Sequence, residues 1–282
     1  MGNNFYEPVI ISCVNKKGGV GKTSTSINLA YSLTQEKLGN NKVLLIDLDS
    51  QCNCTKGVGF YVEDMFDVET LKYKGVGSYK ILREKEPLAE EIYKTEFKNM
   101  DICPATSSLD ELEDHLANAI QRELILAKSM EACWKELLEY DFIIIDNAPT
   151  LKTYTTNSLA IADYILIPLE TDAFSLDGLN ELLDMISQVQ GFNDRLKILG
   201  MLLTRVDSRT NLEGFFRENL KSFADKLFFT SIHQNVAIRR AQFAGKPVLD
   251  FEEDSRSAQE YLGLAEEIIE IIKHDKAKDV AK

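Results

Sequence analysis

The sequence predicts an α/β fold with a mostly parallel, twisted sheet and helices on both of its faces. Short apolar runs that are typical of buried strands alternate with longer stretches of helical periodicity along the chain. A glycine-rich turn joins the first predicted strand to the first predicted helix. In a sheet of this kind, ligands bind at the carboxyl ends of the strands.

The elements follow one another in a regular order. The first strand is predicted from Val9 to Val14, the glycine-rich turn from Lys16 to Gly21, and the first helix from Thr23 to Leu38. Further strands are predicted at Val43–Ile46, Met100–Cys103, Phe142–Ile145, Ile165–Pro168 and Ile198–Leu203. Residues 57–96 have weak periodicity, so we expect short helices and loops there. We predict one domain over residues 1–282, with a charged tail at 274–282 that frays.

The chain is acidic overall but its charge is uneven. It has 32 Lys and Arg against 45 Asp and Glu, a net charge of -13, which argues against wholesale electrostatic binding to nucleic acid or anionic lipid. The segment from Arg195 to Lys246 nevertheless holds ten basic and four acidic residues. Such a segment fits a DNA-facing edge, and a solvated helix face gives the same count. The five scattered cysteines and the lack of a secretory signal indicate reduced cytoplasmic thiols.

The most informative stretch lies between the first strand and the first helix and reads Lys17-Gly18-Gly19-Val20-Gly21-Lys22-Thr23. Its glycines let backbone N–H groups turn inward around phosphate, and the helix N-terminus adds a partial positive charge. The Lys22 ammonium can reach phosphate oxygens, and the Thr23 hydroxyl can bind Mg²⁺. The strict pattern G-x-x-x-x-G-K-[ST] fails, because Lys16 stands where its first glycine belongs.

With Lys17 directly before the glycine pair, this loop resembles the deviant Walker A loop of the ParA/MinD group of dimeric P-loop ATPases. The resemblance implies a P-loop NTPase fold and a Lys17 that crosses to the nucleotide of a partner subunit, so that two subunits sandwich two ATP molecules. That lysine would supply positive charge in trans, as an arginine finger does. The implied phosphate-binding residues are Gly18, Gly19, Val20, Gly21, Lys22, Thr23 and Ser24.

The second strand ends in two carboxylates, Asp47 and Asp49. Residues two apart in extended chain can serve different roles near a metal and a water. The run from Asp47 to Thr55 is similar to the ParA switch motif D-x-D-P-Q-x-N-x-T, with Ser50 in place of the usual Pro. The resemblance assigns Asp49 to the attacking water and Asp47 to the switch and the Mg²⁺ shell.

A third motif is the apolar strand that ends in Asp146, which is how a Walker B strand delivers a carboxylate to Mg²⁺. The next residues, Asn147-Ala148-Pro149-Thr150-Leu151, resemble the family's D-x-P-P-S-L switch, with Ala148 and Thr150 as departures.

Two later segments also resemble ParA motifs. Leu202–Thr210 is similar to L-L-T-x-x-D-x-R-T, and Ile232–Ala241 with Gly245–Pro247 is similar to I-P-x-N-V-x-x-x-x-A…G-K-P. The resemblance implies nucleotide contacts near the adenine, which we assign to Thr204, Arg205, His233 and Asn235. It also implies arginines that bind DNA without sequence preference. Ala237 stands where an arginine is common, so the expected DNA-binding residues are Arg209, Arg239, Arg240 and Lys246.

Together the motifs, from Val9 to Ile272, imply a Mg²⁺-dependent partition ATPase for plasmids or chromosomes, which binds ATP and ADP and turns over slowly. An ATP-induced homodimer would bind nonspecific double-stranded DNA, and a ParB-like centromere-binding partner would stimulate hydrolysis and release. The implied catalytic residues are Lys17, Lys22 and Asp49, and the metal site is Thr23, Asp47 and Asp146. The protein would be cytoplasmic, with the ATP-bound form on the nucleoid and no membrane contact.

Three alternatives stay open at the level of sequence. A ParA-like ATPase that positions another cargo or acts as a regulator without DNA is favoured by the net charge of -13. A MinD-like membrane-cycling ATPase needs a basic amphipathic C-terminal helix, whereas Glu266–Ile272 is acidic. An iron–sulfur relative of the nitrogenase iron protein needs two suitably placed cysteines, and Cys133 lies in a helical stretch.

Overall fold

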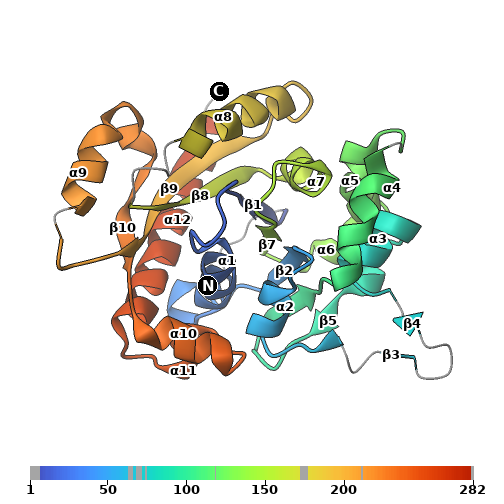
Figure 1. Ribbon diagram of the computed structural model, residues 1–282, viewed down its shortest axis with the longest axis horizontal. Coiled ribbons are helices and arrows are strands. Elements are labelled where there is room, and N and C mark those ends of the chain that lie inside the picture. The colour runs from blue at the N-terminus through green and yellow to red at the C-terminus, as the bar shows by residue number, and fades with distance from the viewer. Residues whose placement is uncertain are drawn as a thin grey trace.

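The computed structural model describes residues 7–62, 66–67, 72–73, 75–117, 119–171, 177–210 and 212–280. Its centre is an eight-stranded sheet with the order β10-β9-β8-β1-β7-β2-β6-β5, in which only the β5–β6 pair is antiparallel (Figure 1). The strands are β1 Val9–Cys13, β2 Val43–Leu48, β5 Tyr93–Lys94, β6 Met100–Cys103, β7 Phe142–Asn147, β8 Tyr164–Glu170, β9 Lys197–Val206 and β10 Leu227–His233. A separate hairpin pairs β3 Phe66–Asp67 with β4 Lys72–Tyr73.

Helices cover both faces of this sheet. They are α1 Lys22–Leu33, α2 Asn53–Gly57, α3 Ser78–Glu84, α4 Leu112–Ala117, α5 Ile125–Glu131, α6 Trp134–Leu137, α7 Thr153–Ile161, α8 Asp177–Gln190, α9 Leu212–Asn219, α10 Val236–Phe243, α11 Val248–Phe251 and α12 Arg256–Val280. Successive residues of a strand point to opposite faces. In β1, Val9 and Ile11 accordingly pack in the layer of α1 and α12, and Ile10 packs in the layer of α3, α5, α7 and α8.

The expected α/β architecture is confirmed, and all six predicted strands are present. The sequence did not predict two strands of the main sheet, the short antiparallel β5 within residues 57–96 and the edge strand β10, or the β3–β4 hairpin. The first helix ends at Leu33 rather than at Leu38, because the Thr34 hydroxyl bonds to the carbonyl of Tyr31 at 2.8 Å and a 3₁₀ turn follows at Glu36–Leu38. No helix in the described ranges is long and apolar enough to cross a membrane.

The sequence predicts a charged tail at 274–282, and in the described part of this segment α12 continues to Val280. Its last turns are held by side chains from the sheet. The Asp275 carboxylate accepts hydrogen bonds from the Tyr164 hydroxyl at 2.7 Å and from the Lys197 ammonium at 2.9 Å. Lys197 also pairs with Asp279 at 2.8 Å. Two of the acidic residues in this tail, Asp275 and Asp279, therefore contact side chains of the sheet.

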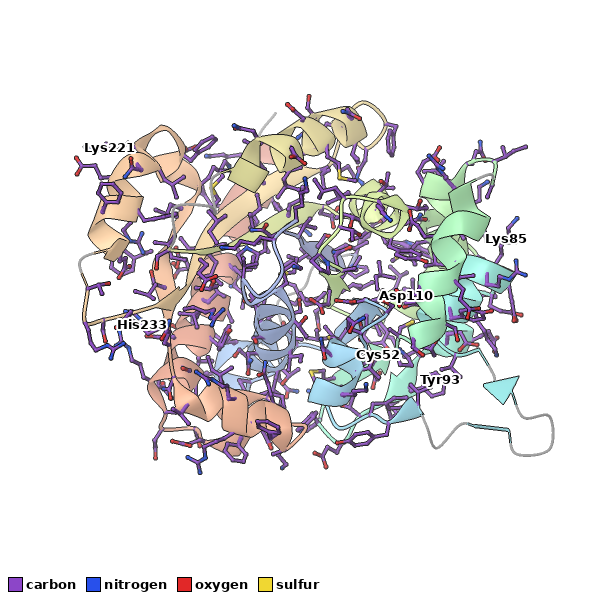
Figure 2. The ribbon with its side chains drawn as sticks, in the orientation of Figure 1. Cys52, Lys85, Tyr93, Asp110, Lys221 and His233 are labelled. Atoms are coloured by element: carbon purple, nitrogen blue, oxygen red, sulfur yellow. The ribbon has the colours of Figure 1, made fainter. Side chains whose placement is uncertain are left out.

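The edge strand β10 is capped by side chains of α12. The backbone N–H groups of Phe229 and Thr230 donate to the Glu267 carboxylate at 2.6 and 3.0 Å. Two helical turns earlier, Glu260 accepts from the backbone N–H of His233 at 2.9 Å. Figure 2 shows His233 where β10 approaches α12. These carboxylates satisfy backbone donors that an edge strand would otherwise leave open.

Candidate functional site

The glycine-rich loop between β1 and α1 has the conformation that a phosphate loop requires. Gly19 and Gly21 have φ angles of 79° and 85°, in the left-handed region that favours glycine. The Thr204 hydroxyl donates to the Val20 carbonyl at 2.7 Å, which ties the loop to the end of β9. The Asn15 side chain braces the start of the loop by accepting from the Lys17 backbone N–H at 2.9 Å. The loop is thus fixed from both sides before any ligand binds.

Two cavities meet at this loop, and Gly19, Gly21 and Ser24 line both. The first, of about 270 Å³, is lined by Gly18, Gly19, Gly21, Lys22, Thr23, Ser24, Asp49, Gln51, Asn53 and Pro149. The second, of about 250 Å³, extends toward α10 and is lined by Gly19, Gly21, Ser24, Thr204, Arg205, Ile232, His233, Gln234, Asn235, Ile238, Arg239, Gln242 and Tyr261. This arrangement suits an elongated ligand with an anionic end in the first cavity and an aromatic, hydrogen-bonding end in the second.

Lys22 lies in the wall of the first cavity with little solvent exposure. Its ammonium donates to the carbonyl of Lys17 at 3.0 Å, so the side chain curls back along the loop. Burial lowers the pKa of Lys22, while the nearby carboxylates of Asp146 and Asp49 act in the opposite sense. A buried cation among backbone N–H groups is suited to binding phosphate oxygens.

Two carboxylates from neighbouring strands face each other beneath the loop, because Asp47 of β2 and Asp146 of β7 are paired in register. Asp47 accepts hydrogen bonds from the backbone N–H groups of Asp49 and Thr55 and from the Thr55 hydroxyl, at 3.0, 2.9 and 2.7 Å. Asp146 accepts from the Ser26 hydroxyl at 2.9 Å, and its second carboxylate oxygen is buried without a hydrogen-bond partner among the described residues.

Burial, followed by repulsion from Asp47, raises the pKa of Asp146 to about 8. Burial likewise raises the pKa of Asp47 to about 6, although its hydrogen bonds from Thr55 act against the rise. An unpartnered, buried carboxylate oxygen at the end of a strand fits a hard divalent cation, which prefers oxygen ligands. The donor set around Asp146 and Thr23 therefore fits Mg²⁺.

Asp49 follows β2 and lines the phosphate side of the site. One of its carboxylate oxygens accepts from the backbone N–H of Gln51 at 3.0 Å, which fixes the turn after the strand. Cys52, labelled in Figure 2 beside α2, has a φ of 54° and is buried. All five cysteines are buried free thiols, and no group of three His, Cys, Asp or Glu among the described residues has the geometry of a metal site.

Lys17 lies on the outer side of the loop in a cluster that the sequence did not predict. The Glu170 carboxylate, at the end of β8, is 3.7 Å from the Lys17 ammonium and 3.3 Å from the Arg205 guanidinium. Arg205 has a φ of 52° and also donates to the Gly19 carbonyl at 3.1 Å. Glu170 thus forms ion pairs with both Lys17 of the loop and Arg205 near the end of β9.

The residues expected near an adenine lie together in the second cavity. The Asn235 side chain accepts from the backbone N–H of Ala237 at 2.9 Å and so caps α10. The His233 ring nitrogen Nδ1 pairs with the Glu260 carboxylate at 2.7 Å, which orients the ring at the end of β10. Thr204 and Arg205 line the same cavity. Glu260 and Gln242 have no signal in the sequence, because their roles depend on contacts distant in the chain.

The four residues expected to bind DNA do not have equivalent environments. Three of them pair with a neighbouring carboxylate: Arg209 with Asp207 at 2.7 Å, Arg240 with Glu252 at 3.1 Å, and Lys246 with Asp250 at 2.9 Å. The fourth, Arg239, lines the second cavity.

Comparisons with known proteins agree with this geometry. The family described as an AAA domain matches residues 9–198. The chain is 39% identical to the sporulation initiation inhibitor protein Soj of Bacillus subtilis over 92% of its length and 97% of that protein. It is 34% identical to the chromosome partitioning protein ParA of Caulobacter vibrioides, over 92% of this chain and 93% of the relative.

Among solved structures, the chain resembles a protein of Borrelia burgdorferi B31 described as a plasmid partition protein and bound to AMPPNP. The TM-score is 0.75 at 26% identity, over 95% of this chain and all of that one. The phosphate loop preceded by an extra lysine, the two strand-end carboxylates and these relationships lead to one conclusion. The chain belongs to the ParA/Soj family of P-loop ATPases.

Proposed function

We propose that this chain is a partition ATPase whose ATP-bound homodimer binds nonspecific double-stranded DNA and releases it when a ParB-like partner stimulates hydrolysis. The observation that carries the proposal is the pair of joined cavities at a phosphate loop that presents a second lysine, Lys17, on its outer side. The relative from Caulobacter vibrioides that is named a chromosome partitioning protein supports the biological role. The expected location is the cytoplasm, with the ATP-bound dimer on the nucleoid.

The two cavities suggest how ATP and ADP would lie. The phosphates would occupy the first cavity, against the loop and the N-terminus of α1, where backbone N–H groups and Lys22 gather. The adenine would lie in the second cavity near Asn235, with the amide side chains of Gln234 and Gln242 on its wall.

For hydrolysis, Thr23 and Asp146 would hold Mg²⁺, which when bound neutralises charge on the phosphate oxygens. The oxygens of Asp47 already accept three hydrogen bonds from Asp49 and Thr55. Asp47 would therefore contribute to the metal shell mainly by holding the switch motif, residues 47–55, in place. Asp49 would orient the attacking water from the wall of the first cavity. Lys22 in cis and Lys17 in trans would stabilise charge on the transferred phosphoryl group.

DNA contacts would come from exposed cations of the basic segment that runs from Arg195 to Lys246. The carboxylate partners of Arg209, Arg240 and Lys246 hold these side chains at the surface, and phosphates can replace such partners because exposed ion pairs are weak. Arg239 was predicted for this surface too. Binding of this kind depends strongly on salt, because each neutralised phosphate releases counterions.

The test measures binding to random-sequence duplex DNA with Mg²⁺ and ATP, ADP or no nucleotide, at two salt concentrations. We expect binding only with ATP, weakened by salt and weakened in Arg209→Ala with Arg240→Ala. In parallel, Lys17→Ala should retain ATP binding and lose the ATP-induced dimer in light scattering. An unchanged dimer in that variant would contradict the trans role of Lys17.

A cargo-positioning or regulatory ATPase is the second candidate, and the net charge of -13 favours it. Wild-type protein that dimerises with ATP but binds no DNA at either salt concentration would select this candidate over the partition function.

A further inference from the structure

We propose that Arg239 contacts the phosphate chain of the bound nucleotide and is a substrate-binding residue rather than a DNA contact. The inference rests on the proposed nucleotide site and deepens it. Arg239 lies on α10, in the wall of the second cavity, and that cavity continues to Gly19, Gly21 and Ser24 of the phosphate loop. An arginine guanidinium only donates hydrogen bonds, so its ligand must offer acceptors, and phosphate oxygens are its best match.

The charge environment of Arg239 differs from that of the other arginines near the site. Arg205 pairs with Glu170, Arg209 with Asp207 and Arg240 with Glu252. Within the described ranges of the chain, no carboxylate lies within ion-pair distance of Arg239. An arginine that lines a cavity without a counter-ion is suited to an anionic ligand.

The position of α10 against the phosphate loop is fixed by three hydrogen bonds along one face of α1. The Gln242 amide donates to the Ser24 hydroxyl at 2.7 Å, and the Val248 backbone N–H donates to the Asn28 side chain at 2.6 Å. One turn further along α1, the Tyr31 hydroxyl donates to Asp250 at 3.2 Å. These contacts hold α10 and α11 against the helix whose N-terminus follows the loop.

Arg239 lies three residues before Gln242, so the two side chains emerge on the same side of α10. Gln242 reaches Ser24 in the first turn of α1, where phosphate oxygens would bind. One helical turn is about 5.4 Å, a distance that an extended arginine side chain spans. The neighbouring Arg240 instead stacks over the Phe251 ring at 5.5 Å and pairs with Glu252.

This geometry gives α10 two roles on adjacent residues. Arg239 binds the nucleotide, and Arg240 belongs to the basic surface. Binding of the phosphate chain therefore acts directly on the helix that carries a proposed DNA contact.

The experiment measures Mg·ADP binding by calorimetry at low and high NaCl for wild type, Arg239→Ala, Arg239→Lys and Arg240→Ala, with thermal melting as the check on folding. Arg240→Ala is the matched control, because it removes the adjacent arginine from the same helix. We expect Arg239→Ala to weaken ADP binding about tenfold at low salt, as the loss of a charge-assisted hydrogen bond does, and to reduce its salt dependence. Arg239→Lys should recover part of the affinity, and Arg240→Ala should bind as wild type does.

Each other outcome counts against the inference. ADP affinity that is unchanged in a folded Arg239→Ala variant overturns it. A loss of affinity with the salt dependence of wild type overturns the phosphate contact, because a contact with the base or ribose is then the cause. An equal loss in Arg240→Ala shows a general effect of helix charge instead. Failure of the wild-type protein to bind ADP overturns the proposed function, and this inference with it.

Discussion

Replacing Asp146 by Asn should stabilise the protein when Mg²⁺ and nucleotide are absent, and the gain should grow with pH. Asp146 is fully buried, and one of its carboxylate oxygens has no hydrogen-bond partner in the described structure. The asparagine carbonyl can still accept the hydrogen bond from Ser26, and the side chain carries no charge at any pH. The substitution therefore removes a buried charge while it keeps the size and shape of the side chain.

The magnitude follows from the raised pKa. The pKa of Asp146 rises from 3.8 to about 8, so between these values the folded protein holds a proton that the unfolded chain has released. Stability from this group is therefore greatest at low pH and is lost as the pH rises toward 8. At 1.36 kcal/mol for each pKa unit, the cost is about 3 kcal/mol at pH 6 and about 6 kcal/mol above pH 8. The uncharged asparagine carries neither the burial cost nor the repulsion from Asp47, so we expect the gain of the variant to about double between pH 6 and pH 9.

The assay is urea unfolding in EDTA without nucleotide, at pH values from 6 to 9. The difference in unfolding free energy between Asp146→Asn and wild type should widen across this range. As a control, Asp101→Asn should be destabilising, because the buried Asp101 carboxylate accepts hydrogen bonds from Tyr140 and Lys94, each at 2.7 Å. A difference for Asp146→Asn that is the same at pH 6 and pH 9 would refute the reasoning.

The remaining predictions concern three other contacts. Glu170→Gln should raise the rate at which an amine-reactive reagent modifies Lys17 in the nucleotide-free protein, measured by mass spectrometry, because it removes the carboxylate 3.7 Å away; an unchanged rate would show that this pair does not hold the lysine. Gly77→Ala should lower the unfolding free energy by about 3 kcal/mol in urea, because the φ angle is 57° and a Cβ atom would lie 1.9 Å from the Pro104 carbonyl oxygen. Asp275→Ala should cost about 1 kcal/mol and lower the melting temperature, whereas an unchanged value would mean that the end of α12 is not anchored.

The strands of the sheet's centre could be predicted because each is an apolar run bounded by a turn or an acid. Phe142–Ile145 and Val43–Ile46 are examples, and each side chain in them is buried in one of the two layers. The edge strand β10 could not be predicted, because Leu227–His233 mixes apolar and polar residues. Its outer backbone N–H groups are bound by Glu260 and Glu267 of α12, which lie far away in the sequence. A strand that pairs with only one other strand and depends on a distant helix shows little of the local sequence pattern by which strands are predicted.

The candidate site also contains some residues that local sequence predicts and others that only contacts distant in the chain bring into place. The loop from Lys17 to Ser24 could be predicted from local sequence, because in a loop of this kind the backbone N–H groups are the phosphate ligands. The geometry puts Asp49 and Thr23 on that same cavity, as the sequence suggested. Glu170 and Gln242 could not be predicted, since each acts on the loop from a strand or helix more than 150 residues away in the chain. Arg239 was assigned from the charge of its segment, which does not reveal the direction of a side chain.

The carboxylates that α12 places along β10 also limit how copies of this protein could assemble. A polymer that grows by continuing the sheet needs a strand edge with open N–H groups, and on this edge Phe229, Thr230 and His233 already donate theirs within the chain. Any filament formed through this side of the molecule would have to be held by side chains between folded units. Such an assembly could come apart with each nucleotide cycle without unfolding its subunits.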